Sequence, residues 1–402
     1  MKKRLLIFSW EYNGYHSVQG TALSKRPRQI AESYRAAGWD VTVVHKDHRN
    51  ESGDARFHVN IEDNGIRRIA VKATDDTGIN RSNPLSRKIE TLYYIAFRGD
   101  RTYRWASDVI SCFPELGIAK PGHIIGCFSP RVPLFLAKYF ADQFNVQWLA
   151  DVQDPIYEGV AKKMWPYCRR WMKSVLSSAK AIVHISPEWA DIDSGRLQLP
   201  VNTIRHAVPA AAPPPTDLKE AEFRTNHGNH FNVFYGGSIS PDIQSLDVLR
   251  AVIEMAADHG VSIKILLAGN DQALKLFTDR LGRQAIHHLG WLSPEDMNRY
   301  IYNCNCTMVI PWSAERIGIP SKLYELCSYP KPIWIVGRDM GAFSSLLNEW
   351  KHPAIATGDV DTQLNAVLAA AHGDTSKMFN LSACTGQVLK ADQLCAAFLR
   401  LL

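Results

Sequence analysis

Short apolar runs alternate along the chain with longer amphipathic stretches, and this alternation predicts an α/β fold. In the first half of the chain the apolar runs cover residues 5–10, 41–44, 123–128, 148–151 and 181–185. In the second half they cover residues 231–235, 263–267, 306–310 and 333–336. Runs of this length, bounded by Gly or Pro, are typical of strands buried on both faces of a parallel sheet. Helical periodicity between them, as in 26–37, 132–143, 243–259 and 294–303, favours βαβ units with right-handed crossovers. The helix over 294–303 is expected to start near Ser293.

The length of the chain and one change in composition divide this pattern into two domains. A chain of 402 residues is too long for one ordinary core, so two domains of about 200 residues each are expected. The stretch 207–215 is rich in Ala and Pro and lacks apolar periodicity, which is typical of a linker. We therefore predict a first domain over 1–208, a linker over 209–229, a second domain over 230–382 and a final helix over 383–402.

Composition adds the class of protein and excludes several partners. The hydrophobic content of 46% and charged content of 21% are typical of a soluble globular protein. The net charge of +6 suits an anionic partner, but the chain has no nucleic-acid-binding motif, so we predict no nucleic acid. Eight scattered cysteines indicate reduced thiols. Because the N-terminal apolar run is too short for a signal peptide and no stretch is long enough to span a bilayer, we predict a cytoplasmic location.

The segment 318–337, GIPSKLYELCSYPKPIWIVG, contains the clearest candidate chemistry. Ser321 occupies a helix N-cap position, and the prolines that follow end the helix before a buried strand. A helix N-terminus suits phosphate, and Lys322 adds a positive charge there. Glu325 lies about one turn later and can accept hydrogen bonds from both hydroxyls of a ribose. The alternative is an amphipathic helix whose charges are only solvated.

The hexapeptide PSKLYE at 320–325, followed by KP and an apolar run, resembles the donor-binding segment of family 4 glycosyltransferases. Those enzymes have the GT-B fold, in which two Rossmann-like, doubly wound domains face a central cleft and a C-terminal helix returns to the first domain. The resemblance implies a retaining hexosyltransferase that moves a sugar from a nucleotide diphosphate-sugar co-substrate, without a further cofactor, to a hydroxyl of a lipid-linked or glycan acceptor. It also implies a role in bacterial envelope polysaccharide or glycolipid synthesis.

In the second domain the resemblance implies donor-binding roles for a set of glycines, polar residues and one tryptophan. Glu325 would hold the ribose, and Lys322 would stabilise the departing diphosphate as a catalytic group. Many family members carry a second glutamate eight residues before Glu325, where this chain has Ile317. The full predicted set is Gly236, Gly237, Ser238, Gly269, Trp291, Arg316, Pro320, Ser321, Lys322, Leu323 and Glu325.

The family's basic residues after the glycine loop are missing here. Between Gly236 and Leu249 the sequence has neither Arg nor Lys, so Lys322, Arg316 and the helix N-terminus would have to neutralise the diphosphate. This departure leaves two alternatives open, a sugar-nucleotide epimerase of the same fold and a catalytically silent binding subunit.

The acceptor side is predicted in the first domain, around the sequence WLADVQDPI at 148–156. It resembles the D-x-R-D-P-W segment of one family branch, with Gln and Ile replacing Arg and Trp. Asp154 follows a strand at the edge where open α/β sheets bind ligands, so it can orient the acceptor hydroxyl or take its proton. Alternatively, Asp154 caps the turn beside Pro155. The other acceptor-side candidates are Gly14, Arg26, Arg28 and Asp151, and a solvated helix start explains the two arginines equally well.

No metal site is predicted. Two D-x-D triplets occur, at 191–193 and 359–361, but neither directly follows a strand. Asp359 instead has the position of a cap for a helix over 363–371.

A peripheral contact with an anionic membrane is predicted from a basic and aromatic segment without acidic residues. Basic residues near aromatic rings suit the headgroup region of a bilayer. The alternative is that the tryptophans belong to the core and only the charges are exposed. The segment contains Lys162, Lys163, Trp165, Tyr167, Arg169, Arg170, Trp171, Met172 and Lys173. A second mixture of basic and aromatic residues, over 81–105, allows the same two interpretations.

Overall fold

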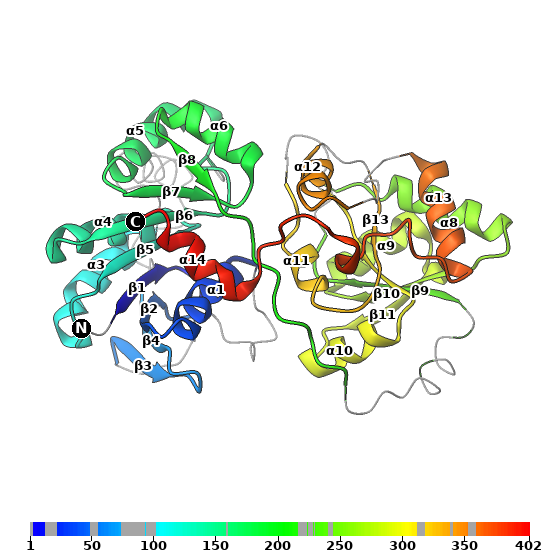
Figure 1. The fold of residues 1–402 in the computed structure, drawn as a ribbon, viewed down its shortest axis with the longest axis horizontal. Helices are drawn as coiled ribbons and strands as arrows, with labels where there is room; N and C mark the ends of the chain where they lie inside the picture. The colour runs from blue at the N-terminus through cyan, green and yellow to red at the C-terminus, as the bar shows by residue number, and fades with distance from the viewer. Residues whose placement is uncertain are drawn as a thin grey trace, which may run out of the picture. The chain divides into compact units, whose positions relative to one another are not determined.

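The computed structural model describes residues 3–12, 22–48, 55–73, 93, 102–157, 160–215, 223, 228, 230–239, 244–311, 318–337, 341–352 and 359–402, with the backbone alone for 22–24. The chain forms two compact units. The first contains Met1–His206 and Ala391–Leu402, and the second contains Ala207–Lys390 (Figure 1). Each unit is built around its own sheet, and the two are described separately below.

The sheet of the first unit has eight strands in the order β3-β4-β2-β1-β5-β6-β7-β8. All neighbours are parallel except β3 and β4. The strands predicted in this half are confirmed, whereas β3 and β4 lie where no strand was predicted. The bounds are β1 (Arg4–Ser9), β2 (Asp40–Lys46), β3 (Phe57–Ile61), β4 (Arg67–Val71), β5 (His123–Phe128), β6 (Gln147–Val152), β7 (Ala181–His184) and β8 (Val201–Thr203).

Helices cover both faces of this sheet, as doubly wound folds require. Leu6 and Phe8 of β1 lie in one core with α3 and α4, where Phe8 stacks on Phe140 at 5.3 Å between ring centroids. The alternate residues Leu5 and Ile7 are buried on the opposite face. The helices are α1 (Ala22–Ala36), α3 (Tyr103–Cys112), α4 (Val132–Phe144), α5 (Trp165–Leu176), α6 (Pro187–Leu197) and α14 (Leu394–Leu399), with 3₁₀ turns at Phe113–Leu116, Lys162–Met164 and Ala391–Gln393.

The end of the chain packs on the first unit, as predicted. The Cys395 amide of α14 donates to Ser33 Oγ of α1 at 2.7 Å. The helix is shorter than the predicted 383–402, because residues before it follow the surface of the second unit. Gly386 donates its amide to Trp350 O at 2.8 Å, and a Cβ at this glycine would lie 2.3 Å from Glu349 O. This close backbone contact is incompatible with a continuous helix.

The sheet of the second unit has five parallel strands in the order β11-β10-β9-β12-β13. Apolar clusters fill both faces, with Val233 and Tyr235 on one and Phe234 on the other. The strands are β9 (Phe231–Gly236), β10 (Ile263–Ala268), β11 (Ile286–Gly290), β12 (Cys306–Val309) and β13 (Ile333–Ile335). The helices are α8 (Asp247–Asp258), α9 (Asp271–Leu281), α10 (Pro294–Asn303), α11 (Lys322–Leu326), α12 (Ala342–Glu349) and α13 (Val360–Ala371).

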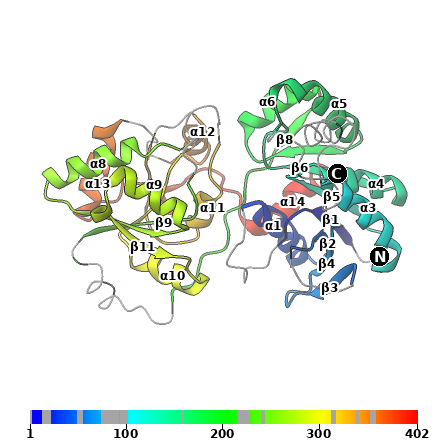
Figure 2. The same cartoon turned by 180° about the vertical axis from the view of Figure 1, so that it is seen from behind.

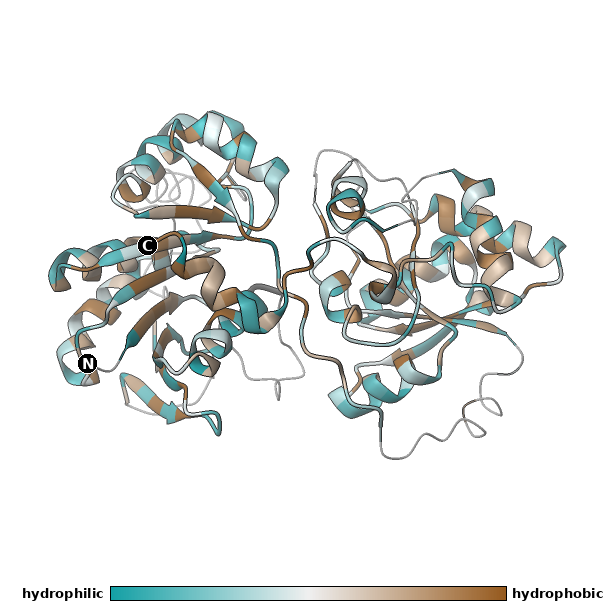
Figure 3. Ribbon diagram, viewed as in Figure 1, coloured by the Kyte–Doolittle hydropathy of each residue, from teal (hydrophilic) through white to brown (hydrophobic). Residues whose placement is uncertain are grey.

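Two predicted helix starts in this unit are confirmed by their capping bonds. Ser293 Oγ accepts from the Asp296 amide at the start of α10. Asp359 Oδ2 accepts from the Thr362 amide at the start of α13, at 2.8 Å. The helices carry both polar and apolar residues, while the strands are mostly apolar (Figure 3). Figure 2 shows the same elements from behind. Within the described residues no helix is long and apolar enough to cross a bilayer.

Candidate functional site

The carboxyl ends of β9, β10 and β11 meet at glycines. The Gly237 amide donates to Ala268 O at 2.8 Å, and the Gly269 amide donates to Gly290 O at 3.0 Å. Gly237 has a φ of +107°, which strains any residue with a side chain. A Cβ on Gly269 would lie only 2.9 Å from Gly237 O. The predicted donor residues Gly237 and Gly269 therefore form a bare backbone edge at the end of the sheet where open α/β folds bind ligands.

Lys322 brings a positive charge to this edge. Its Nζ lies 4.1 Å from the centroid of the Tyr235 ring and 3.5 Å from the position that a Cβ on Gly237 would occupy. The Nζ atom is buried, and among the described residues it has no hydrogen-bond partner. Burial of an ammonium group without an acceptor is costly, so this arrangement suits an anion that approaches the glycine edge.

The five-residue helix α11 supplies Lys322 and the rest of the PSKLYE segment. Ser321 occupies the N-cap position, but its side chain makes no capping bond, and its φ of −56° and ψ of −25° are helical. Leu323 is fully buried in the core, which leaves only its backbone to face a ligand. Pro320 is also buried, and its carbonyl accepts from the Leu323 amide at 3.0 Å. Glu325 is half-buried at the last turn.

The other predicted donor residues lie at the ends of the same strands. Gly236 is the last residue of β9, and the Ser238 carbonyl accepts from the Tyr235 hydroxyl at 3.0 Å. Trp291 directly follows β11 and is 60% exposed, which is unusual for so large an apolar side chain. Arg316 lies outside the described residues. The structure thus brings most of the predicted donor set to one edge of the second sheet.

Arg26 and Asp151, both predicted on the acceptor side, form a buried ion pair in the first unit. Arg26 Nε and Nη2 donate to Asp151 Oδ1 at 3.2 and 3.1 Å, and both side chains are 0% exposed. Arg26 Nη1 also donates to Arg205 O at 2.7 Å, and the guanidinium lies over the Phe398 ring of α14. Burial raises the pKa of Asp151, although the charge of Arg26 acts in the opposite direction. The pair joins α1, β6 and α14, a placement that favours a structural role.

Asp154 is half-buried in the loop after β6, at the carboxyl edge of the first sheet. The loop is held at Ile156, whose amide donates to Asp193 Oδ2 at 3.2 Å and whose carbonyl accepts from Arg131 Nη2 at 2.9 Å. Burial raises the pKa of Asp193 to about 6. Sequence reasoning missed Arg131 and Asp193 as supports of this loop, because their partners are backbone atoms that leave no signal in the sequence.

Known structures match the chain over its full length. Sucrose-phosphate synthase from Thermosynechococcus elongatus superposes with a TM-score of 0.63 at 16% identity, covering 100% of this chain and 98% of that one. HepE from Anabaena in complex with UDP-glucose gives 0.58 at 12%, covering 99% and 100%. TarM gives 0.63 at 10%, covering 100% and 99%. The chain has the GT-B fold. No family model and no curated protein matches the sequence.

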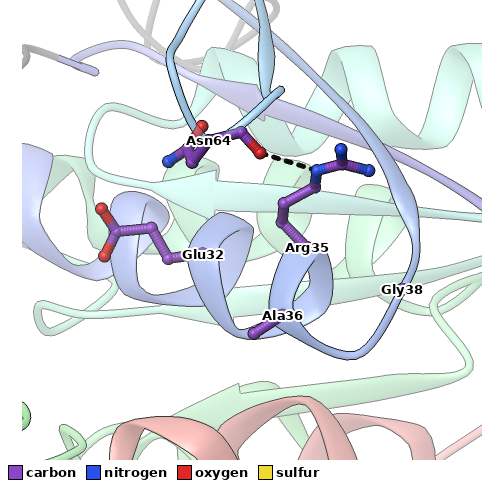
Figure 4. Close-up of a pocket in the computed structure, with 5 residues that line it drawn as sticks. All are labelled: Glu32, Arg35, Ala36, Gly38 and Asn64. Atoms are coloured by element: carbon purple, nitrogen blue, oxygen red, sulfur yellow. Dashed lines mark hydrogen bonds between the residues drawn. The ribbon is translucent and has the colours of Figure 1, made fainter.

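In this GT-B chain the remaining acceptor-side candidates are less informative. Arg28 Nε donates to Glu32 Oε1 at 2.7 Å, one turn later on α1. Gly14 lies outside the described residues. A shallow pocket nearby is lined by Glu32, Arg35, Ala36, Gly38 and Asn64 (Figure 4). Arg35 Nε is bonded there to Asn64 O at 2.8 Å, and the pocket lies at the C-terminal end of α1, away from the carboxyl ends of the strands.

Neither D-x-D triplet of the GT-B chain belongs to a metal-ligand cluster in the part that the structure describes. Among those residues no group of three or more His, Cys, Asp or Glu side chains is placed to hold a metal ion. Asp193 holds the Asp154 loop, and Asp359 caps α13 as predicted.

The basic segment of the first unit forms a 3₁₀ turn followed by α5. Pro166 lies in the first turn of α5, where the missing amide of a proline is tolerated. Trp171 and Met172 are buried in the core, and Trp165 Nε1 donates to Val160 O at 3.0 Å. The structure therefore favours the alternative in which the tryptophans are core residues. The exposed members of the segment are Lys162, Lys163, Tyr167 and Arg170, while Arg169 and Lys173 are half-buried. Most of the second mixture, over 81–105, lies outside the described residues.

Proposed function

We propose that this chain transfers a sugar from a nucleotide diphosphate-sugar to a hydroxyl acceptor. The observation that carries the proposal is the buried ammonium of Lys322, which lies beside Gly237 at the carboxyl edge of the second sheet and has no hydrogen-bond partner in the part of the chain that the structure describes. A diphosphate would supply the missing acceptor, and the glycine backbone leaves space for its oxygens. The full-length likeness to sucrose-phosphate synthase and HepE supports this assignment through the fold.

The chemistry follows from where negative charge develops. Transfer breaks the bond between the anomeric carbon and the diphosphate oxygen, and that oxygen leaves with the bonding electrons. The acceptor hydroxyl oxygen forms the new bond to the anomeric carbon, and its proton passes to the departing diphosphate. The Lys322 ammonium would stabilise this charge without a metal ion, and Glu325 would hold the ribose. Asp154 would orient the acceptor hydroxyl in the first unit. We propose a hexose donor and retention of anomeric configuration, both on the family resemblance.

The proposed setting is bacterial envelope polysaccharide or glycolipid synthesis. The acceptor would be a glycan or a lipid-linked sugar at the cytoplasmic face of the membrane. A peripheral contact with anionic lipid is supported by exposed basic residues. These are Lys162 and Lys163 in the 3₁₀ turn before α5, and Arg170 on α5.

One experiment separates the proposal from its two alternatives. The protein is incubated with UDP-, ADP- and GDP-sugars without acceptor, beginning with UDP-glucose, the ligand in the HepE structure. A transferase binds one of them and hydrolyses it slowly at most, whereas an epimerase converts it and a silent subunit leaves every donor unchanged even when acceptors are added. Donor consumption with a glycan acceptor should also persist in excess chelator. Loss of activity that manganese restores would refute the metal-independent mechanism.

A further inference from the structure

The first unit has a ligand-binding edge of its own at the point where the direction of its chain crossovers reverses. β1 and β5 are parallel neighbours, but the chain continues from β1 to β2 on one side and from β5 to β6 on the other. In open α/β sheets such a switch point leaves a crevice outside the carboxyl ends of the two strands. The residues that follow β1 there are Trp10 and Glu11.

The backbone of this segment is held firmly. Ser9 Oγ donates to Glu11 O at 2.8 Å, and the Lys46 amide of β2 donates to Trp10 O at 3.2 Å. His48 Nε2 lies 3.1 Å from the same Trp10 carbonyl. Glu11 is therefore fixed at the carboxyl edge by contacts to β1 and to the segment after β2.

The carboxylate of Glu11 is left incomplete by these contacts. Its Oε2 atom is buried and has no hydrogen-bond partner within the described ranges, which leave out residues 13–21. Lys46 Nζ lies 4.7 Å from the centroid of the Trp10 ring, and His48 Nε2 contacts the Trp10 carbonyl, so neither group donates a hydrogen bond to Glu11 Oε2. Burial raises the pKa of Glu11, while the charges of His48 and Lys46 act to lower it. A buried acceptor without a donor costs stability, and such a group in a native protein requires an explanation, which a functional role such as ligand binding supplies.

The charges around Glu11 select the chemistry of that ligand. The carboxylate itself repels a phosphate or carboxylate, and the nearby Lys46 and His48 disfavour a cation. A neutral hydroxyl group can donate to Oε2 without either penalty. The half-buried Trp10 ring, packed against Trp105 at 5.5 Å between centroids, adds an apolar wall. This combination of one polar acceptor and one aromatic wall is typical of a site for a sugar or polyol.

We infer that Glu11 binds a hydroxyl group of a neutral sugar or polyol acceptor at the β1–β5 switch point of the first unit. The inference rests on the proposed function, since a transferase needs an acceptor site, and it adds a binding residue that the family resemblance does not supply and restricts the bound group to a neutral one. Glu11 carries no sequence signal beyond a charged residue soon after a buried strand, which is why sequence reasoning passed over it.

The test uses the full chain with the methyl glycosides of glucose, galactose, mannose and N-acetylglucosamine, and with glucose 6-phosphate as the charged comparison. Saturation-transfer NMR measures binding to wild type, Glu11→Gln, Glu11→Ala and the matched control Glu115→Gln, an exposed carboxylate paired with Arg56. We expect at least one neutral glycoside to bind wild type and the control equally. Its dissociation constant should rise about tenfold or more in Glu11→Ala, with a smaller rise in Glu11→Gln.

Two further readouts separate this inference from a structural role and from the proposed function. Removing an unpaired buried charge should leave the thermal midpoint of Glu11→Gln unchanged or raised, so weaker binding by this variant is not explained by misfolding. The affinity for UDP should be equal in wild type and the Glu11 variants. If no nucleotide binds to any of these proteins, the proposed donor site is refuted, whereas glycoside binding that depends on Glu11 still supports the acceptor site. Equal glycoside affinity in wild type and both Glu11 variants, no neutral glycoside bound, or preferential binding of glucose 6-phosphate would overturn the inference.

Discussion

Substitution of Lys322 by Met tests the charge at the glycine edge directly. Met keeps the length and apolar stem of the side chain but removes the ammonium. A charge-assisted hydrogen bond is worth about 1.5–3 kcal/mol, so the nucleotide dissociation constant should rise roughly 10- to 150-fold. The protein without ligand should change little in stability. The lost contact with the Tyr235 ring, at 4.1 Å, contributes about 0.5–2 kcal/mol, and relief of an unpaired buried charge offsets it.

Lys331→Met is the matched control, because Lys331 belongs to the same segment but faces the amino ends of the strands. Its Nζ donates to Cys304 O at 2.9 Å, just before β12. Removing this satisfied donor should lower the unfolding free energy by about 1 kcal/mol and leave nucleotide affinity unchanged. Calorimetric titration with UDP, ADP and GDP, together with urea unfolding, measures both quantities. If Lys322→Met binds the preferred nucleotide as tightly as wild type does, Lys322 does not contact the diphosphate and the donor site has been misplaced.

Three further outcomes are expected. Glu325→Ala should weaken donor binding at least about tenfold in the same titration while the thermal midpoint is kept, because it removes two charge-assisted hydrogen bonds to ribose; an unchanged dissociation constant excludes that role. In vesicle sedimentation the protein should bind anionic but not neutral lipid, weaken with salt and lose binding when Arg169 and Arg170 become Glu; indifference to anionic vesicles at low salt would favour a soluble acceptor. Burial lowers the pKa of His184 in the folded protein to about 3, whereas its pKa in the unfolded chain is about 6.5. The unfolded chain therefore binds a proton at this site between these two pH values, and the contribution of neutral His184 to the unfolding free energy is full above about pH 6.5 and is lost as the pH falls toward 3. His184→Asn should flatten the dependence of the urea midpoint on pH over this window, and equal slopes for both proteins would refute this account.

The elements that could be predicted from sequence are those whose signal is local. The run 333–336 favours a strand because a strand buried on both faces of a sheet is apolar at consecutive positions, and β13 covers Ile333–Ile335. Ser293 and Asp359 were identifiable as helix caps because a capping side chain acts within three residues of its own position. The glycine edge of the second sheet was visible for the same reason, since each glycine directly follows a strand.

Contacts between segments that are far apart in the chain could not be predicted from the sequence. Arg26 and Asp151 are 125 residues apart and have the same local signal as exposed ligand-binding charges, yet they pair with each other in the core. Leu323 is part of a motif that the resemblance assigns to donor binding, but its side chain fills the core beneath the motif. The residues before α14 do not form the predicted helix, because Gly386 contacts the backbone of Trp350. The hydrophobic periodicity of the sequence gives no sign of this contact.

If the chain binds a nucleotide diphosphate as proposed, the position of Lys322 explains how it does so without the basic residues that family 4 glycosyltransferases place after the glycine loop. A diphosphate responds to where a charge lies in space, whichever element of the chain supplies it. Lys322 reaches the vicinity of Gly237 from α11, and the face of the Tyr235 ring holds its Nζ at that point. Because Tyr235 belongs to β9, the cation is positioned by the same strand that leads into the glycine edge. A charge fixed in advance in this way loses little side-chain entropy when the ligand binds, so one rigid lysine can do much of what two mobile basic residues do.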